Sequence, residues 1–365
     1  MRCYDMKSTK EENITLIHKL SEAKAPSGFE DESIAVGRAF AQAFADVEED
    51  RLRNLYVTRR ENKGDRPVFM LDAHGDEVGM MIHSIKPNGT LRFVTLGRFT
   101  PGTLPGAKVW VRNRNGEYIP GIVAAKPPHF MSAEERNRLM DVTDLVIDIG
   151  ARSAEEAKEI FGIQIGEPVV SAVDFSYDDK RDILIGKGFD CRIGCAAMLE
   201  TMKRLTEEDV PMDVVGVMSS QEEVGDGGVK VAVDRIRPNV AICFEGCPAD
   251  DTFTEIYAIQ TALKKGPMIR FMDVSMIANS RYMRDTIALA EKHGIPLQTS
   301  VRTGGGNNGA VINLAGEGIP VIVIGIPVRY IHSHYGIASY QDFEAAVELA
   351  VNVVKEMTPE KAASF

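Results

Sequence analysis

The chain has 365 residues, with 42 lysines and arginines against 53 aspartates and glutamates, and a formal net charge of -11. This length favours two domains over one, and the negative charge argues against nucleic-acid binding, which requires a basic surface. The longest apolar stretch, residues 319–328, is too short to span a membrane. The N-terminal segment does not resemble a signal peptide, so we expect a cytoplasmic protein.

The first eighty residues are predicted to form helices and then strands. Apolar residues at helical spacing predict helices over 14–20 and 29–44. Short apolar runs at 55–57 and 67–73 predict strands, and His74 follows the second run directly.

A β-rich segment follows Gly79. Residues 83–125 alternate in polarity and are rich in glycine and proline, and the Asn-Gly pairs within 87–89 and 113–116 predict hairpin turns. Capping boxes at 132–135 and 153–156 predict two short helices on either side of a strand at 145–149. We therefore expect residues 80–171 to form a small β-rich domain inserted into a larger domain built from residues 1–79 and 172–365.

The remainder of the chain has an α/β pattern. Valine- and isoleucine-rich runs predict buried strands at 213–219, 240–244 and 320–324, and helices are predicted over 193–205, 280–293 and 341–357. The sequence thus predicts a mixed central sheet flanked by helices. In open α/β sheets, ligands bind outside the carboxyl ends of the strands.

Residues that bind metals follow four of these predicted strands. His74, the pair Glu222 and Glu223, Glu245 and His332 each come at or shortly after a strand end. Because the strand ends would meet at one rim, these distant residues would converge there, and such a set is typical of a catalytic metal site.

Three of these motifs carry further information. In His74-Gly75-Asp76, residues two apart face the same side of an extended chain, so Asp76 can support the histidine. Asp190 comes just before a predicted helix and, taken alone, favours an N-cap aspartate. Glu222 and Glu223 are adjacent acids that need a compensating cation if both are desolvated. In a two-metal hydrolase one such acid binds metal while the other accepts a proton from water.

Four cysteines form two C-x-x-x-C pairs, Cys191 with Cys195 and Cys243 with Cys247. A shared structural zinc site is conceivable, but the spacing differs from the usual C-x-x-C and cysteine often behaves as a small core hydrophobe. We expect all four thiols to be reduced and buried.

Together, these motifs resemble those of the tetrahedral (TET) aminopeptidases, a metallopeptidase family that includes glutamyl and deblocking aminopeptidases and proteins described as cellulase M. The resemblance covers nearly the whole chain. It is carried by residues 25–28, 74–79, 146–150, 188–190, 221–225, 272–279 and 329–333.

The resemblance implies a phosphorylase/hydrolase-like metallopeptidase fold and hydrolysis of N-terminal residues from peptides by two divalent ions, usually zinc or cobalt. It implies that the inserted domain mediates dimer contacts or acts as a lid, and that dimers assemble into a dodecamer. The implied metal ligands are His74, Asp190 and Glu245 for one ion, and Asp190, Glu223 and His332 for the other. Asp190 would bridge the ions, Glu222 would be the general base and Asp76 would orient His74.

The chain departs from the family pattern at three positions. Gly75 stands where the family usually has a bulkier residue, Glu245 where it commonly has Asp, and Cys191 where it usually has Asn. These changes bear on substrate and metal preference more than on the type of reaction.

Several alternatives remain open from the sequence. Residues 304–309 match G-x-G-x-x-G, although the acidic residue expected about 20 positions later in a dinucleotide site is missing. A metal-dependent deacylase of N-acyl amino acids or peptides would use the same metal ligands. An endoglucanase would need only paired carboxylates, and a non-catalytic assembly protein would lose no activity when metal is removed.

Overall fold

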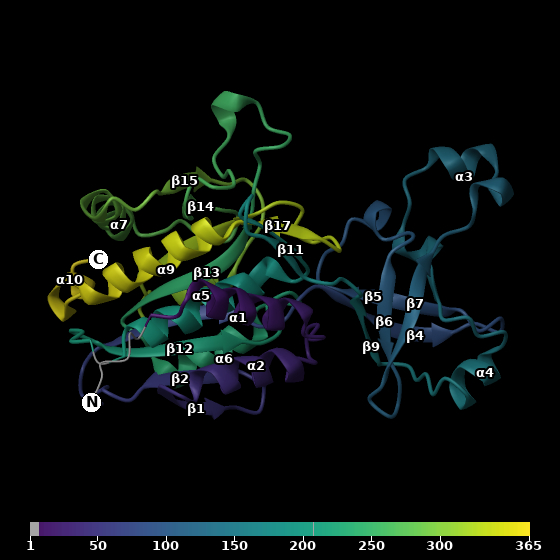
Figure 1. Cartoon of the computed structure of the whole chain (residues 1–365), viewed down its shortest axis with the longest axis horizontal. Coiled ribbons are helices and arrows are strands. Elements are labelled where there is room, and N and C mark those ends of the chain that lie inside the picture. Colours follow the sequence, from purple (N-terminus) through teal and green to yellow (C-terminus); the bar gives the residue numbers. More distant parts are fainter. Residues whose placement is uncertain (1–6, 207) are drawn as a thin grey trace.

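The computed structural model describes residues 7–206 and 208–365. Figure 1 shows a larger α/β body and a smaller β-rich body joined by a narrow connection. Within the described residues, no helix combines the length and the apolar character needed to cross a membrane. The N-terminal segment, which was predicted not to be a signal peptide, begins with residues 1–6. These residues lie outside the described part of the chain.

In the described part of the chain, the larger body contains an eight-stranded sheet with the order β1-β2-β12-β3-β13-β16-β14-β15. Strands β12, β3, β13 and β16 at its centre are parallel, while β2 and β14 flank them in the antiparallel direction. The carboxyl ends of the central strands therefore share one rim, and Ser219 of β12 lies opposite His74 of β3. The strands are β1 (Ala45–Glu49), β2 (Leu55–Arg59), β3 (Val68–His74), β12 (Asp213–Ser219), β13 (Val240–Pro248), β14 (Met268–Met272), β15 (Gln298–Val301) and β16 (Val321–Val328).

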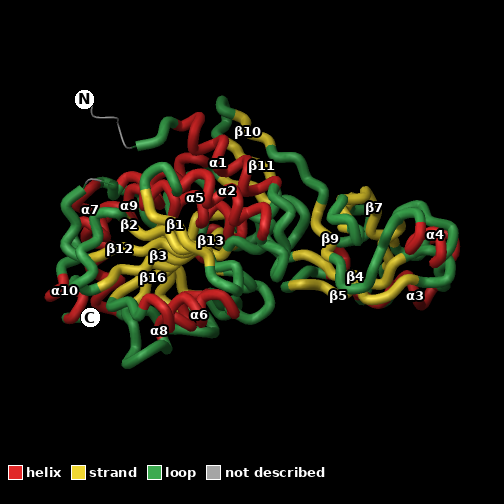
Figure 2. Tube along the Cα trace, turned by 90° about the horizontal axis from the view of Figure 1, so that it is seen from below, coloured by secondary structure: helices red, strands yellow, loops and turns green. Residues whose placement is uncertain are grey.

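Helices cover both faces of this sheet (Figure 2). On one face, α5 (Phe189–Arg204) lies directly on the central strands and beneath α1 (Lys10–Glu22), α2 (Asp31–Ala41) and α9 (Tyr340–Lys355). On the other face lie α6 (Gly227–Ile236) and α8 (Asn308–Asn313). Because α5 is enclosed between the sheet and other helices, nearly all its residues are buried. The remaining helices of this body are α7 (Ser280–His293) and α10 (Pro359–Ala363).

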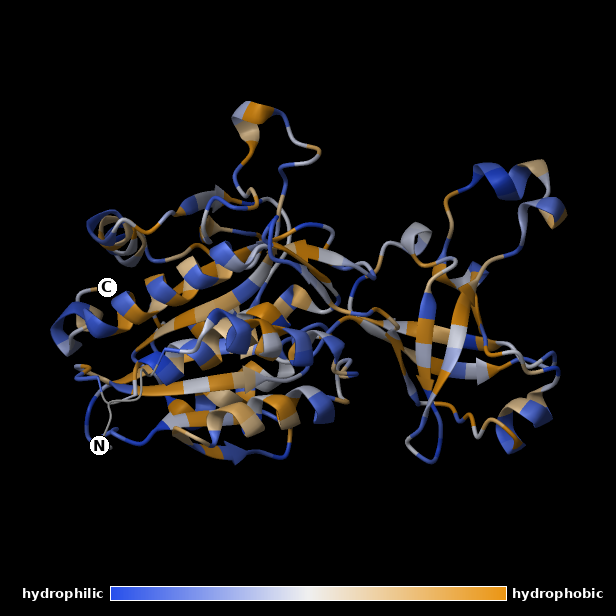
Figure 3. Cartoon of the chain, in the orientation of Figure 1, coloured by the Kyte–Doolittle hydropathy of each residue, from blue (hydrophilic) through white to orange (hydrophobic). Residues whose placement is uncertain are grey.

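The smaller body is a closed barrel with the strand order β4-β5-β8-β7-β6-β9. Its buried residues form a hydrophobic cluster separate from that of the larger body, and Figure 3 shows apolar residues along the strands of both bodies. The barrel elements are β4 (Gly79–Ile85), β5 (Leu91–Leu96), β6 (Lys108–Arg112), β7 (Tyr118–Ala124), α3 (Ala133–Asn137), β8 (Val146–Asp148), α4 (Ala154–Glu159) and β9 (Pro168–Ser171). A small sheet of β10 (Ser176–Asp178), β11 (Ile183–Gly186) and β17 (Gly336–Ala338) completes the fold.

The predicted fold class is confirmed: a mixed α/β sheet carries an inserted β domain. Both predicted Asn-Gly turns connect neighbouring barrel strands, with Gly89 and Gly116 at positive φ.

Two details of the prediction are wrong, the end of one strand and the form of one helix cap. Strand β13 continues to Pro248, so Glu245 lies within the strand, because β16 pairs with β13 as far as Val328.

The second predicted capping box is only half formed. The Ser153 hydroxyl accepts from the Glu156 amide as expected. The Glu156 carboxylate, however, accepts from the backbone amide and guanidinium of Arg152, whose contacts replace the expected bond to Ser153.

Candidate metal centre

The predicted site residues converge at the carboxyl rim of the central sheet. A cavity of about 400 Å³ is lined by Asp190, Glu222, Glu223, Glu245 and His332. His74, at the end of β3, lies directly behind them and is 1% exposed. A larger hollow of about 650 Å³ lies far from this rim, between α1 and α2, and is lined by residues such as Leu16, Phe40 and Lys203.

Asp190 lies between the two histidines. Its Oδ1 is 3.2 Å from Nε2 of His74, and its Oδ2 is 3.2 Å from Nε2 of His332. Each carboxylate oxygen thus faces a different ring, which is the arrangement needed to bridge two ions. The N-cap interpretation of Asp190 is wrong: Gly188 is the N-cap of α5, and Asp190 itself has non-helical backbone angles and lines the cavity.

The second ring nitrogen of each histidine faces an oxygen atom of another residue, and within the described residues the one of His332 makes a hydrogen bond while the one of His74 does not. Nδ1 of His332 donates to the backbone carbonyl of Arg98 at 2.8 Å, and Nδ1 of His74 lies 3.4 Å from Oδ1 of Asp76. A donor proton on Nδ1 leaves the lone pair on Nε2 free to bind a cation, which is how metal-ligating histidines are usually oriented.

Asp76 fixes the acidic loop as well as His74. Its two oxygens accept from the backbone amides of Glu222, at 3.1 Å, and Glu223, at 3.2 Å. The Ser27 hydroxyl donates to the same carboxylate at 2.6 Å. Because this carboxylate is fully buried and accepts several hydrogen bonds, one residue sets the position of a histidine and of two neighbouring acids.

The buried carboxyl groups of the cluster lie so close together that a bound cation would stabilise their ionised forms. Burial and the nearby Asp190 carboxylate raise the pKa of Glu222 to about 7 and the pKa of Glu223 and Glu245 well above their usual range, although His74 opposes the shifts. Burial would also raise the pKa of Asp190, but hydrogen bonds from His332 and His74 outweigh it and lower that pKa. Carboxyl groups so close together cannot all ionise without nearby positive charge.

The side chains present fit a pair of divalent ions. Oε1 of Glu223 is buried and has no hydrogen-bond partner among the described residues. This carboxylate belongs to the same cluster as Asp190 and His332, so a bound cation could satisfy the unpaired acceptor. Three compact and overlapping groups could hold an ion: His74 with Cys191 and Glu245, His74 with Glu222 and Glu223, and Asp190 with Glu223 and His332. Imidazole nitrogens with carboxylate oxygens suit zinc and neighbouring transition metals.

The sequence analysis missed several residues of the cavity. Arg270 of β14 and Arg302 after β15 line its wall, and Cys191 lies beside His74 and Glu245. The arginines carried no local motif, whereas Cys191 was noted in the sequence as a departure from the family pattern and only its place beside His74 and Glu245 was missed. The Gly304–Gly306 segment lines the same cavity and leads into α8. The glycine-rich loop is therefore part of the wall of this cavity.

The sequence is similar to known proteins over nearly its full length. The sequence model described as M42 glutamyl aminopeptidase matches residues 54–349. Lysyl aminopeptidase of Pyrococcus furiosus is 32% identical over 349 residues, which cover 94% of this chain and 97% of the relative.

Solved structures are also similar to this chain over nearly its full length. The TET aminopeptidase from the marine sediment archaeon Thaumarchaeota archaeon SCGC AB-539-E09 has a TM-score of 0.93 and 36% identity, covering 97% of this chain and 99% of that one. The TET1 peptidase of Pyrococcus horikoshii, which can assemble into a tetrahedron or a large octahedral shell, has a TM-score of 0.84 and 29% identity, with 94% and 100% covered. The similarity therefore extends over both bodies of the chain.

Proposed function

Because this chain belongs to the M42 glutamyl aminopeptidase family and is a metallo-aminopeptidase, we propose that its rim residues hold two divalent ions, zinc or cobalt. Asp190 would bridge the ions, and its equal distances of 3.2 Å to the two histidines support this role. The proposed ligands are His74 and Glu245 for one ion and Glu223 and His332 for the other.

When bound, the ions supply Lewis acidity, which acidifies a water molecule and polarises the scissile carbonyl. Glu222 is the general base: it accepts a proton from the attacking water and returns it to the leaving amine. Its Oε2 lies 3.8 Å from Nε2 of His74, so it faces the proposed ions. Asp76 accepts a hydrogen bond from the Glu222 amide and orients His74, so it fixes the position of the base relative to one proposed metal ligand.

The cavity wall favours an acidic side chain at the substrate N-terminus. Arg270 and Arg302 both line the cavity, and their Nε atoms are buried without a hydrogen-bond partner among the described residues. Asp273 pairs with Arg270 at 2.8 Å and Asp250 with Arg302 at 3.4 Å. Arg302 also donates to the Pro248 carbonyl and the Thr261 hydroxyl, so both guanidinium groups are held in place and Arg270 keeps more free donors than Arg302. A substrate carboxylate would satisfy such donors.

One experiment tests the reaction and the preference together. The purified protein is analysed for metal and assayed on glutamyl, leucyl and lysyl anilides, each with a free and with an acetylated amine. We expect metal-dependent hydrolysis of the free-amine substrates, fastest for glutamyl. Hydrolysis of the acetylated set alone would identify a deacylase instead, and faster lysyl than glutamyl turnover would refute the acidic preference.

We also propose that residues 1–79 and 172–365 form the catalytic unit and that residues 80–171 serve in dimerisation or as a lid within a larger homo-oligomer, up to a dodecamer. Large apolar side chains of the barrel body support this, since Phe130, Leu139 and Ile160 are 73%, 95% and 77% exposed. Light scattering on the protein and on Leu139→Asp tests the assembly: we expect a defined oligomer that the charge weakens, and a monomeric wild type would refute it.

A further inference from the structure

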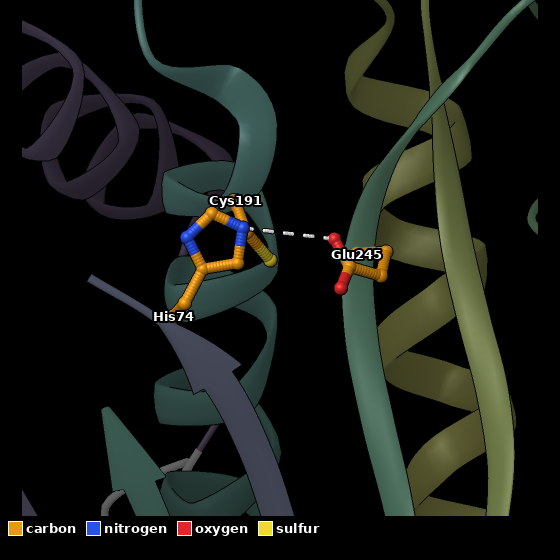
Figure 4. A group of neighbouring side chains, drawn as sticks. All are labelled: His74, Cys191 and Glu245. Atoms are coloured by element: carbon orange, nitrogen blue, oxygen red, sulfur yellow. Dashed lines mark ion pairs between the residues drawn. The ribbon is translucent and has the colours of Figure 1, made fainter. Parts of the chain in front are cut away.

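A buried thiol lies against the position proposed for one of the two ions. The ligand atoms of His74, Cys191 and Glu245 all lie within 4.8 Å of one another, and all three residues are buried. Figure 4 shows the His74 ring facing the Glu245 carboxylate, with the Cys191 sulfur on the Glu245 side of the ring. Nε2 of His74 and Oε2 of Glu245 are 3.8 Å apart.

These separations are close to those of atoms that share one ion. Zinc bonds of about 2.3 Å to sulfur and about 2.1 Å to nitrogen or oxygen allow ligand atoms up to about 4.4 Å apart. The His74–Glu245 pair meets this limit, and the sulfur lies within 4.8 Å of the ligand atoms of both residues.

Two glycines allow the thiol to reach this place. A Cβ on Gly246 of β13 would lie 2.3 Å from the backbone oxygen of Phe189, and a Cβ on Gly194 would lie 2.4 Å from the Cys191 sulfur. A side chain at Gly246 would therefore push the start of α5 away from β13, and one at Gly194 would displace the Cys191 sulfur. The sequence thus maintains the close packing that brings Cys191 beside Glu245.

We propose that Cys191 is a thiolate ligand of the ion held by His74 and Glu245. The inference rests on the dinuclear site of the proposed function and extends it. Without the ion, the thiol donates to the Phe244 carbonyl at 3.0 Å; coordination replaces this weak hydrogen bond, and the thiol proton leaves to solvent.

The two metal positions would then differ in chemical character. Thiolate ligands select zinc and other soft or borderline ions, whereas carboxylate and imidazole alone also accept manganese or magnesium. The position with Cys191 would retain zinc or cobalt, and the position with Glu223 and His332 would exchange its ion more readily.

The cobalt-loaded protein tests the proposal through its absorption spectrum. Wild-type protein carrying two cobalt ions should show a near-ultraviolet thiolate-to-cobalt charge-transfer band, and Cys191→Ala should lose it. Cys195→Ala is the matched control, because Cys195 is also buried and donates to the His74 carbonyl at 3.0 Å without belonging to the ligand group. Chelator competition should show zinc held at least about 10–100-fold less tightly by Cys191→Ala than by the control, since this is the loss known for residues that only support a ligand.

Two results would overturn the proposal: wild-type protein with two bound cobalt ions and no such band, or a band that persists in Cys191→Ala. The wild-type spectrum decides the question even if the variant fails to fold. Failure to bind any ion would refute the proposed function itself, so failure of the thiolate ligand and failure of the metal site give different results.

Discussion

Replacing Glu222 by Gln should abolish most turnover while leaving both ions bound. The amide is nearly the same size as the carboxylate but cannot accept the proton of the attacking water. The Glu222 backbone remains held by Asp76, and the proposed ligands Glu223 and His332 are unchanged, so the site keeps its shape. A positioned general base contributes about 10²–10⁴-fold, equivalent to about 3–5 kcal/mol in the activation barrier at about 1.4 kcal/mol per tenfold.

The assay is kcat on a free-amine aminoacyl anilide, with metal content measured on the same samples. Glu223→Gln is the matched control, because the neighbouring acid is a proposed ligand and its loss should release an ion. Turnover of Glu222→Gln within about tenfold of wild type, or loss of metal from that variant, would refute the assignment of Glu222 as the base.

Three further changes probe the surroundings of the site. Asp76→Asn places an amide opposite the backbone donors and His74, so we expect a loss of about 10–100-fold in metal affinity or activity; an unchanged chelator titration would contradict this. Arg192→Met removes a buried guanidinium that donates to four backbone carbonyls. It should lower the free energy of unfolding, measured in urea, by about 3–5 kcal/mol. The control Arg204→Met, at a more exposed arginine, should lower it less. Burial, and secondarily Asp76, raise the pKa of Glu30 to about 7, so its contribution to stability is complete at low pH and is lost as pH rises through about 7. Glu30→Gln in metal-free protein should therefore gain about 1–3 kcal/mol over wild type above pH 7 and little below about pH 4, and a difference independent of pH would contradict this.

The convergence of the site was predictable because it follows from topology. Apolar runs ending near His74, Glu222 and His332 indicated buried strands, and parallel strands bring their carboxyl ends to one rim. The aminopeptidase class and the inserted β domain were likewise accessible from motifs and from the change in periodicity after Gly79.

Other features depended on contacts that no local pattern encodes. Glu245 lies inside β13 because the pairing with β16 extends further than the apolar run indicated. Asp190 has the local signature of a helix cap; the family resemblance implied another role, and its 3.2 Å approach to both His74 and His332 follows from tertiary contacts. Arg270 and Arg302 enter the cavity from β14 and the end of β15, whose strand positions relative to the site could not be read from composition.

Anomalous diffraction from crystals of the zinc-loaded protein would test the metal assignment most directly. We predict two peaks in the rim cavity, both in contact with Asp190, one next to His74 and the other next to His332. Peaks remote from Asp190, or an ordered cavity without any peak in protein that has bound zinc, would contradict the assignment.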